Sequence, residues 1–364
     1  MSENDHLIRA LHLAAQGRGL TSPNPMVGAV LVKGGRVIGE GWHRYFGGDH
    51  AEVDALKHAK ASPRGATLYV NLEPCAHFGK TPPCVDALIS SGIKKVVASM
   101  PDPNPVVSGK GIRRLRQAGI KVEVGRMRSE SRELNASYLT WLKERRPFIA
   151  LKAGQSLDGK ISSRTGRSKW ITGPAARVYG RRLRFMFDAI LAGINTVLSD
   201  DPSLDYRPPV LGRALLSRKR HFKVILDSRG RLPLSAQLWR GPSQVAVAVS
   251  EAAPESRLRA LRRRGARVLV CGQKRVDVKK LMSLLRPEVG SVLVEGGAQV
   301  HGSFVDAGLV DLFYLFQAPL ILGGERARTS VAGRGFESPA RALRMSLAAE
   351  YCLGEDHLHV YRNR

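Results

Sequence analysis

The chain has 364 residues, and because domains usually contain about 100 to 200 residues, two domains are expected. Hydrophobic residues make up 43% and charged residues 24%, which excludes a disordered or fibrous protein. The sequence has no run of about 18 apolar residues and no signal-like N-terminus, so we expect a cytoplasmic protein with no membrane partner. The formal net charge of +27 favours anionic partners, but basic residues outnumber acidic ones in both halves and aromatic residues are only 6%, which favours phosphorylated small molecules over nucleic acid.

The first part of the chain predicts a sheet flanked by helices. Helical spacing of apolar residues predicts a helix over 5–16, and apolar runs at 27–32 and 37–41 predict strands joined by a turn at Gly34 and Gly35. Further elements then alternate, with helices at 50–61, 85–91 and 109–118 and strands at 67–71, 96–100 and 122–124. This alternation is typical of an α/β layer domain.

A domain boundary is expected near residue 146, which gives domains over 1–146 and 147–364. A polar amphipathic segment ends at Pro147, and an apolar strand at 148–153 follows. Further strands, separated by helix-like stretches, are predicted at 189–192, 224–226, 245–249, 268–270, 292–294 and 312–316. The second domain is therefore also expected to be α/β. Residues 204–220 are predicted to form a long polar loop.

The four cysteines are too few for a disulfide scaffold. Cys75 and Cys84 lie close together in the sequence, so they are expected to bind a metal or to react. Cys271 and Cys352 each stand alone in an apolar segment, and we expect both to be buried structural thiols.

The clustered cysteines belong to a set of residues that fits a catalytic zinc site. Zinc in a hydrolytic site is held by three protein ligands, with Cys and His preferred, and keeps one position for water. His50 and Cys84 at predicted helix starts, and Cys75 after a predicted strand, supply such a set. Zinc brings the pKa of its water toward about 7, and Glu52 could accept the water proton and deliver it to departing ammonia. These residues predict a zinc-dependent hydrolytic deaminase.

Two other interpretations of this motif stay open. H-x-E followed by P-C-x-x-C is the signature of nucleobase deaminases in general, so a nucleic-acid base deaminase that uses the basic surface is one alternative. A structural zinc module, in which Glu52 has no role, is the other. The spacing also differs from the signature, because eight residues rather than two separate the cysteines. His43 and His77 could line the site, whereas His58 is expected to be a solvated helix residue.

A glycine pair in the second domain could approach a phosphate. Gly296 and Gly297 follow Glu295 at the end of a predicted strand and precede a helix-like stretch, where backbone N–H groups could reach an anion. A glycine pair at such a junction can also be only a tight connection. No G-x-G-x-x-G follows a predicted strand, so a Rossmann domain is not expected.

Segments spread over nearly the whole chain resemble one family. These segments are PNPMVGAV (23–30), HAEV (50–53), LEPCAHFGKTPPC (72–84), PDPNP (101–105), SLDGKI (156–161), SKWIT (168–172), NTVLSDDPSL (195–204), VILDS (224–228) and VEGGAQVHGSF (294–304). They are similar to the bacterial bifunctional riboflavin-biosynthesis deaminase/reductases. The resemblance implies a cytidine-deaminase-like three-layer α/β/α domain followed by a dihydrofolate-reductase-like α/β domain.

The resemblance also implies a two-step reaction. The first domain would use zinc to deaminate 2,5-diamino-6-ribosylamino-4(3H)-pyrimidinone 5′-phosphate, and the second would use NADPH to reduce the ribosyl chain, giving 5-amino-6-ribitylaminouracil 5′-phosphate. The expected partner is therefore a phosphorylated pyrimidine riboside rather than nucleic acid, and a homo-oligomer is left open.

Site residues follow from the matching motif positions. The resemblance implies substrate contacts in the deaminase domain at Asn24, His43, Lys80, Asp102 and Asn104, and in the reductase domain at Ser168, Arg184, Leu204, Arg207 and Glu295. It implies NADPH contacts at Gly154, Trp170, Thr196, Asp200, Ser228, Gly297, Ala298, Gln299, Val300, His301, Gly302 and Ser303. Lys152 and Asp200 are candidates for polarising the reacting sugar.

Several of these positions also fit simpler roles. Asn24, Asp102 and Asn104 could be turn residues. Arg184 and Arg207 could clamp a phosphate, or they could be solvated arginines.

Overall fold

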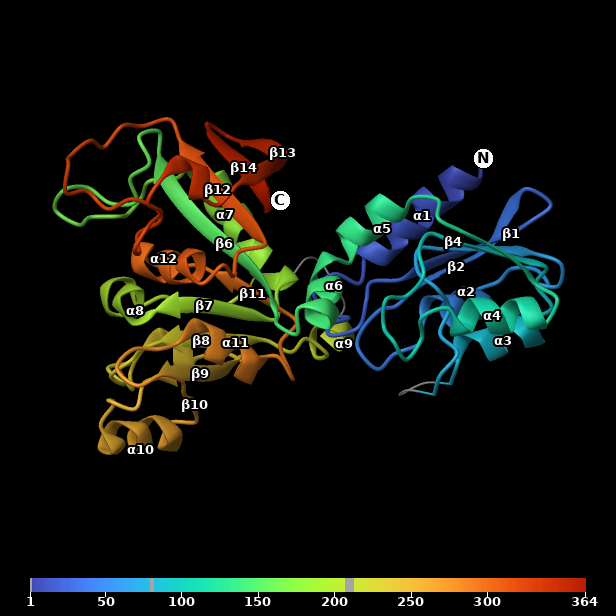
Figure 1. Cartoon of the computed structure of the whole chain (residues 1–364), viewed down its shortest axis with the longest axis horizontal. Helices are drawn as coiled ribbons and strands as arrows, with labels where there is room; N and C mark the ends of the chain where they lie inside the picture. Colours follow the sequence, from blue (N-terminus) through green and yellow to red (C-terminus); the bar gives the residue numbers. More distant parts are fainter. Residues whose placement is uncertain (1, 79–81, 207–212) are drawn as a thin grey trace. The chain divides into compact units, whose positions relative to one another are not determined.

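The computed structural model describes residues 2–78, 82–206 and 213–364. It divides into two compact units (Figure 1). The N-terminal unit comprises Met1–Arg145 and Leu211–Lys219, and the C-terminal unit comprises Arg146–Val210 and Arg220–Arg364. None of the described helices is long and apolar enough to cross a membrane.

A five-stranded sheet forms the centre of the N-terminal unit. Its order is β2-β1-β3-β4-β5, in which β1 runs antiparallel to β2 and β3, and β3, β4 and β5 are parallel. The strands are β1 (Gly28–Lys33), β2 (Arg36–Trp42), β3 (Thr67–Val70), β4 (Lys95–Ala98) and β5 (Lys121–Val124). Each corresponds to a strand expected from the sequence.

Helices cover both faces of this sheet. Leu7, Ala10 and Leu13 of α1 (Glu3–Ala15) pack on one face with Val30 and Tyr69. The other face is covered by α2 (Ala51–Lys57), α3 (Cys84–Ser90) and α4 (Lys110–Gln117), and α5 (Arg128–Leu134) and α6 (Ala136–Lys143) follow in the chain. Apolar side chains of the strands point to both faces of the sheet and pack against the helices on each face. This arrangement confirms the three-layer α/β/α fold. α2 is shorter than the predicted helix over 50–61.

A nine-stranded sheet runs through the C-terminal unit in the order β10-β9-β8-β7-β11-β6-β12-β14-β13. The strands from β10 to β12 are parallel, and β14 and β13 add an antiparallel hairpin at one edge. The strands are β6 (Phe148–Ser156), β7 (Ala189–Gly193), β8 (Phe222–Leu226), β9 (Gln244–Val249), β10 (Arg267–Val270), β11 (Ser291–Val294), β12 (Leu312–Ala318), β13 (Met345–Leu353) and β14 (Asp356–Asn363). The hairpin has no counterpart among the predicted elements.

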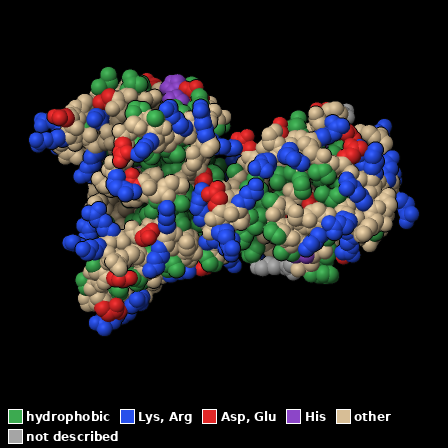
Figure 2. All heavy atoms as spheres, viewed as in Figure 1, with side chains coloured by type: hydrophobic (Ala, Val, Ile, Leu, Met, Phe, Trp, Pro, Cys, Tyr) green, Lys and Arg blue, Asp and Glu red, His purple; other side chains and the backbone are tan. Residues whose placement is uncertain are grey.

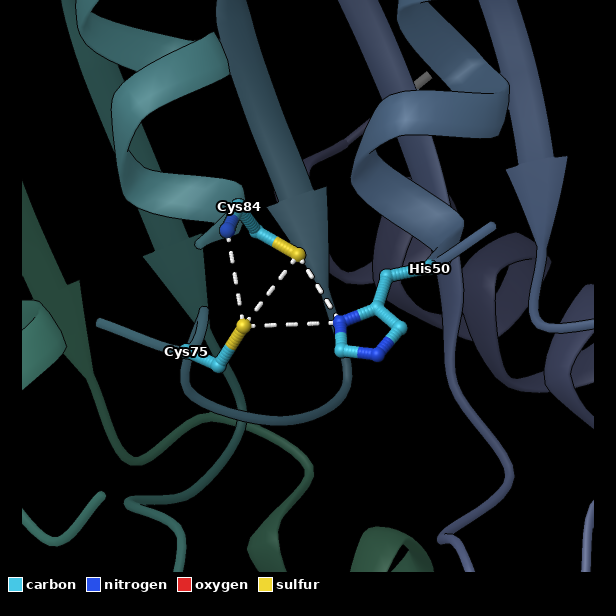
Figure 3. Close-up of side chains that lie close together, drawn as sticks. All are labelled: His50, Cys75 and Cys84. Carbon is cyan, nitrogen blue, oxygen red and sulfur yellow. Dashed lines mark hydrogen bonds between the residues drawn. The ribbon is translucent and has the colours of Figure 1, made fainter. Parts of the chain in front are cut away.

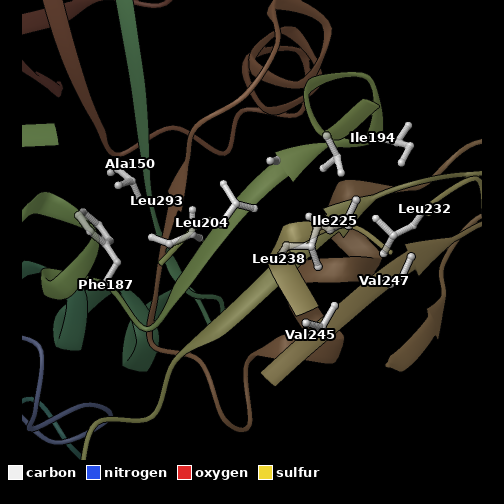
Figure 4. Close-up of a cluster of buried hydrophobic side chains, with 14 of the residues drawn as sticks. Ala150, Phe187, Ile194, Leu204, Ile225, Leu232, Leu238, Val245, Val247 and Leu293 are labelled. Atoms are coloured by element: carbon white, nitrogen blue, oxygen red, sulfur yellow. The ribbon is translucent and has the colours of Figure 1, made fainter. Parts of the chain in front are cut away.

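Two apolar layers enclose the larger sheet. One layer, part of which Figure 4 shows, contains side chains of β7, β8 and β9 together with α7 (Pro174–Leu183), α8 (Ile194–Asp200) and α10 (Glu255–Arg263). The other contains α11 (Val278–Leu285) and α12 (Ala298–Asp306). Short helical turns are η1 (Arg184–Met186), η2 (Gln237–Trp239) and η3 (Pro339–Arg341). The parallel strands are buried on both faces, as their continuous apolar runs predict.

Two expectations from the sequence are corrected. Cys271 is buried as predicted, but Cys352 is exposed, because it lies on β13 at the edge of the sheet, where a strand has a neighbour on one side only. The segment 204–220 is not simply a polar loop, since Leu204 is 2% exposed and α9 (Arg213–Leu216) lies within it.

Candidate functional site

Three predicted metal ligands converge in the N-terminal unit (Figure 3). His50 immediately precedes α2, Cys75 lies in the segment after β3, and Cys84 is the first residue of α3. The Nδ1 atom of His50 lies 3.0 Å from Sγ of Cys84 and 3.4 Å from Sγ of Cys75, and the two sulfur atoms are 3.5 Å apart. Ligands of one tetrahedral zinc ion lie roughly 3.3–3.8 Å from one another, so two of the three distances are in this range and the His50–Cys84 distance is about 0.3 Å shorter. The donor set and its spacing therefore fit zinc.

The thiols of Cys75 and Cys84 share a hydrogen bond that shifts their pKa values in opposite directions. This bond, with help from His50 and against the effect of burial, lowers the pKa of Cys75 to about 4, and it raises the pKa of Cys84. Zinc takes two thiolates and a neutral imidazole, so the thiol of Cys84, whose pKa is raised, has to give up its proton when zinc binds. Zinc binding is therefore expected to release protons.

Glu52 lies beside these ligands. Its side chain is 3% exposed on the first turn of α2 and shares a hydrogen bond with the thiol of Cys84. Burial raises the pKa of Glu52 to about 7, against the opposing effect of His50. The carboxyl group is outside the group of three converging ligand atoms. A buried carboxyl next to a metal site can hold and move a proton there.

We expect Cys84→Ser to remove zinc from this site, because a hydroxyl group is a far weaker zinc ligand than a thiolate. Wild-type protein dialysed against metal-free buffer should retain one zinc per chain, and the variant should retain almost none, measured by atomic absorption. Cys271→Ser changes a buried thiol outside the site and is the matched control. Full zinc retention by Cys84→Ser would contradict the assignment.

Two of the residues expected to bind substrate lie next to His50. His43 is 2% exposed, and its ring packs edge-on against that of His50 with centroids 5.4 Å apart. Its Nδ1 atom lies 2.9 Å from the carbonyl oxygen of Asp49, and its Nε2 atom lies 3.2 Å from Nδ2 of Asn24. Burial lowers the pKa of His43 to about 4, so the ring is neutral at pH 7. His43, which contacts His50, and Asn24, which contacts His43, therefore present polar, uncharged groups near the zinc ligands.

Asp102 and Asn104 belong to the segment after β4, and their hydrogen bonds are local. The Oδ1 atom of Asp102 accepts from the backbone N–H of Asn104 at 2.9 Å and from the hydroxyl group of Tyr138 at 2.8 Å. The Oδ1 atom of Asn104 accepts from the backbone N–H of Val106 at 3.1 Å. These bonds agree with the turn interpretation and leave open whether the residues also contact substrate.

A residue that the sequence analysis missed anchors this segment. Glu73 is 3% exposed and accepts hydrogen bonds from the backbone N–H groups of Asp102, Gly109, Gly111 and Ile112 at 3.0–3.2 Å. It thereby ties the segment after β4 to the chain next to Cys75. The only signal in the sequence is a glutamate directly before Pro74 and Cys75.

We expect Gly111→Ala to be strongly destabilising. A Cβ atom at this position would lie 1.9 Å from the carbonyl oxygen of Pro74, so the segment that carries Cys75 would have to move. The expected loss of unfolding free energy is about 1–3 kcal/mol, which a urea titration would measure. Arg113→Ala, at an exposed position of the same helix, is the control. Equal stability of the two variants would contradict this prediction.

Three further residues singled out in the first domain are Lys80, His77 and His58. Lys80 lies outside the described residues. His77 has a buried Nδ1 atom without a hydrogen-bond partner among the described residues. The side chain of His58 is 58% exposed, as expected, but His58 is the C-cap residue just after α2 and not part of the helix.

In the C-terminal unit, two predicted substrate residues bind each other. Arg184 forms two hydrogen bonds of 2.8 Å with Glu295 and a third, of 3.0 Å, with the carbonyl oxygen of Asp205. The two side chains are 15% and 5% exposed, so the alternative that Arg184 is solvated is wrong. Burial raises the pKa of Glu295, but Arg184 and Lys152 outweigh it and lower the pKa to about 2. Lys152 therefore belongs to this charged cluster.

Several predicted cofactor residues meet where β11 leads into α12. A Cβ atom on Gly296 or Gly297 would lie 3.2 or 3.6 Å from Oγ1 of Thr196, and one on Gly193 would lie 2.8 Å from Val300. The backbone at this junction is thus closely approached by α8. Ala298, Gln299 and Ser303 follow on α12, and Gly302 leaves no room for a side chain against the carbonyl oxygen of Ala332.

Within this group, the imidazole of His301 is buried and contacts backbone carbonyl groups. It is 3% exposed, and its Nδ1 and Nε2 atoms lie 2.8 and 3.2 Å from the carbonyl oxygens of Ser330 and Val294. Any contact of this residue with a cofactor would therefore come from its backbone.

The remaining predicted cofactor residues are spread over other elements. Asp200 has Lys169 at 4.0 Å and accepts from the hydroxyl group of Ser199. Trp170 is 69% exposed, with the guanidinium group of Arg177 4.6 Å from its ring. Gly154 faces Thr172, and Ser228 accepts from the backbone N–H of Val276. Of the predicted substrate residues, Ser168 is partly buried and Arg207 lies outside the described residues.

Comparison with known proteins agrees with the two units. Residues 1–100 match the cytidine and deoxycytidylate deaminase zinc-binding region, and residues 147–358 match the RibD C-terminal domain. The fold and the site thus define a two-domain protein with a cytidine-deaminase-like zinc domain and a dihydrofolate-reductase-like reductase domain. The chain belongs to the RibD family, the bifunctional deaminase/reductases of riboflavin biosynthesis.

Relatives match along the full length. Riboflavin biosynthesis protein RibD of Actinobacillus pleuropneumoniae is 39% identical over 365 residues, covering 99% of this chain and 95% of the relative. The Escherichia coli protein of the same name is 40% identical over 338 residues, covering 89% and 90%. The structure of Acinetobacter baumannii RibD, form 1, superposes with a TM-score of 0.89 at 37% identity, covering 100% and 99%. A Thermotoga maritima structure gives 0.84 at 36% identity, with the same coverage.

Proposed function

We propose that this protein deaminates 2,5-diamino-6-ribosylamino-4(3H)-pyrimidinone 5′-phosphate with zinc and then reduces the ribosyl chain with NADPH. The observation that carries the proposal is the convergence of His50, Cys75 and Cys84 with buried Glu52 beside them. The Thermotoga maritima relative is named as a diaminohydroxyphosphoribosylaminopyrimidine deaminase and 5-amino-6-(5-phosphoribosylamino)uracil reductase. We assign deamination to residues 1–146 and reduction to residues 147–364, in the cytoplasm and without a nucleic-acid partner.

In the deaminase step, zinc would supply the Lewis-acid chemistry that activates the attacking water. Glu52 takes the water proton and passes it to the leaving amino group, which departs as ammonia. Asn24, neutral His43, Lys80, Asp102 and Asn104 together contact the base, ribose and phosphate of the substrate. The burial of Glu52 supports its role, because a carboxyl with a raised pKa can both accept and return a proton near pH 7.

In the reductase step, we place NADPH at the junction of β11 and α12, next to Thr196. The N-terminus of α12, with the backbone N–H groups of Gly297, Ala298 and Gln299, suits a phosphate there. NADPH would supply the hydride for C1′ of the open-chain sugar, where Lys152 and Asp200 would meet the developing charge. Glu295 and Arg184 position the substrate, with Ser168, Leu204 and Arg207 as further contacts.

A coupled assay tests the proposal. Purified protein is incubated with the ribosylaminopyrimidine phosphate, and ammonia release is followed first and NADPH oxidation second. Both signals are expected, in that order, from the zinc-loaded protein. A protein that gives neither signal, while retaining zinc and its thermal unfolding transition, would falsify the proposal. Deamination of cytosine in single-stranded DNA instead would support the nucleic-acid alternative.

Asp200→Ala tests the reductase assignment. If Asp200 meets charge on the reacting sugar, NADPH oxidation with the deaminated intermediate should slow by about 100-fold or more, while ammonia release is unchanged. Ser199→Ala removes the neighbouring hydroxyl group that donates to Asp200 but keeps the carboxylate, so it is the matched control. Unchanged reduction by Asp200→Ala would remove this residue from the mechanism.

A further inference from the structure

A group of side chains on the β13–β14 hairpin lies outside both proposed sites. The hairpin forms one edge of the nine-stranded sheet, and its register places Glu350 opposite His359. His357 and His359 are two residues apart on β14, so their side chains lie on the same face of the sheet. Leu358 between them is fully buried on the opposite face. The histidines are therefore held on the outer face by the packing of β14.

The two imidazole rings converge on one carboxylate oxygen. The Oε1 atom of Glu350 lies 2.9 Å from Nε2 of His359 and 3.5 Å from Nδ1 of His357. All three atoms lie within 4.8 Å of one another. The side chains of Glu350 and His357 are about half exposed, and Figure 2 shows a histidine patch with acidic side chains at the surface over this end of the sheet. A metal ion in solution can therefore reach the group.

We propose that Glu350, His357 and His359 form a second metal site, which binds a divalent transition-metal ion such as Zn²⁺. Two imidazole nitrogens and one carboxylate oxygen suit zinc, nickel or copper, whereas magnesium and calcium require oxygen ligands. Three protein ligands leave a fourth tetrahedral position for water.

The arrangement offers more than an ordinary surface ion pair. An ion pair needs one imidazole, in its protonated form, and such exposed pairs contribute little to stability. A metal ion instead binds one ring nitrogen of each of the two imidazoles. On a chain with a formal net charge of +27, the carboxylate of Glu350 also supplies the negative charge that a cation needs.

The position of the ligands predicts a mechanical effect. Glu350 is on the edge strand β13, whereas both histidines are on β14, so a bound ion links the two strands side chain to side chain. Among the described strands, β13 has a hydrogen-bonded neighbour only on the β14 side. Metal binding at this site is therefore expected to stabilise the edge of the reductase sheet, independently of the deaminase zinc.

Equilibrium dialysis against micromolar Zn²⁺ tests the proposal. The wild-type protein should bind two zinc ions per chain, of which one is removed by dialysis against metal-free buffer and the other stays. His359→Asn and Glu350→Gln should each weaken binding of the removable ion by roughly 10- to 100-fold or more, because each deletes a direct ligand. Excess Mg²⁺ should not compete.

Controls separate this site from the deaminase centre. His12→Asn removes an exposed histidine elsewhere and should leave both zinc ions in place. Cys84→Ser should lose the retained zinc and keep the removable one. Reduction of the deaminated intermediate by Glu350→Gln, at an exposed position, verifies that the C-terminal unit of the variant is folded. A single zinc per chain in the wild type, or a removable zinc unaffected by both ligand variants, would overturn the proposal.

Discussion

Glu52→Gln is expected to abolish ammonia release while leaving zinc bound. The amide has nearly the same shape as the carboxyl but cannot accept the proton of the attacking water. General acid–base groups typically contribute about 10²–10⁴-fold, so ammonia release should fall by at least about 100-fold. Because Glu52 lies outside the group of three ligand atoms, zinc content should remain at the wild-type value. Ammonia release and metal content, measured on the same preparation, check both expectations.

The same variant separates the two activities. Supplied with the deaminated intermediate, Glu52→Gln should oxidise NADPH at the wild-type rate, because its change is confined to the deaminase site. Glu130→Gln, at an exposed position of α5, is the matched control and should affect neither step. Undiminished ammonia release would reject the proton-transfer role. Loss of zinc together with activity would instead make Glu52 a residue that supports the metal site.

The sequence predicted the zinc site well because each of its residues can be recognised from local information. His50 and Cys84 lie at helix starts and Cys75 lies in the segment after β3, and the chemistry of their side chains limits what they can do together. The buried strands were equally visible, since short continuous or alternating apolar runs between turn residues are typical of strands.

The features that the sequence did not predict depend on contacts between distant segments. Nothing in the sequence around Glu73 indicates its role, because the four backbone N–H groups that bind its carboxylate come from the distant segment 102–112. β13 was missed because apolar Leu347 and Tyr351 are exposed along with its polar and small residues, so the strand lacks the apolar alternation of a half-buried strand. For the same reason, the apolar letters around Cys352 suggested burial at a position that is exposed.

The pairing of Arg184 with Glu295 joins residues that are 111 positions apart. From the sequence, each residue looked like a separate contact to the substrate. In the structure they form one buried unit with Lys152 nearby, so the substrate would meet a preset arrangement of charges rather than independent side chains. Replacing either residue should therefore disturb the other.

Arg184→Met is accordingly expected to destabilise the C-terminal unit. The substitution leaves the carboxylate of Glu295 buried without its main cation, and breaking such a pair typically costs about 3–5 kcal/mol. The double variant with Glu295→Gln should recover part of this loss, because the uncompensated charge is gone. Urea titrations of the single and double variants measure the coupling. Arg182→Met, at an exposed position of α7, is the matched control and should have little effect.

The contribution of the Glu295 carboxylate to stability should decrease as the pH falls. The folded-state pKa of Glu295, about 2, is lower than the 4.5 of a free glutamate, so the pair stabilises the folded state above about pH 4.5 and loses this contribution as the pH falls toward 2. The stability difference between wild type and Glu295→Gln should therefore be largest near neutral pH and shrink on acidification. A difference that stays constant from pH 7 down to pH 3, the range in which the unfolded carboxylate becomes protonated, would show that the charge of Glu295 does not stabilise the fold.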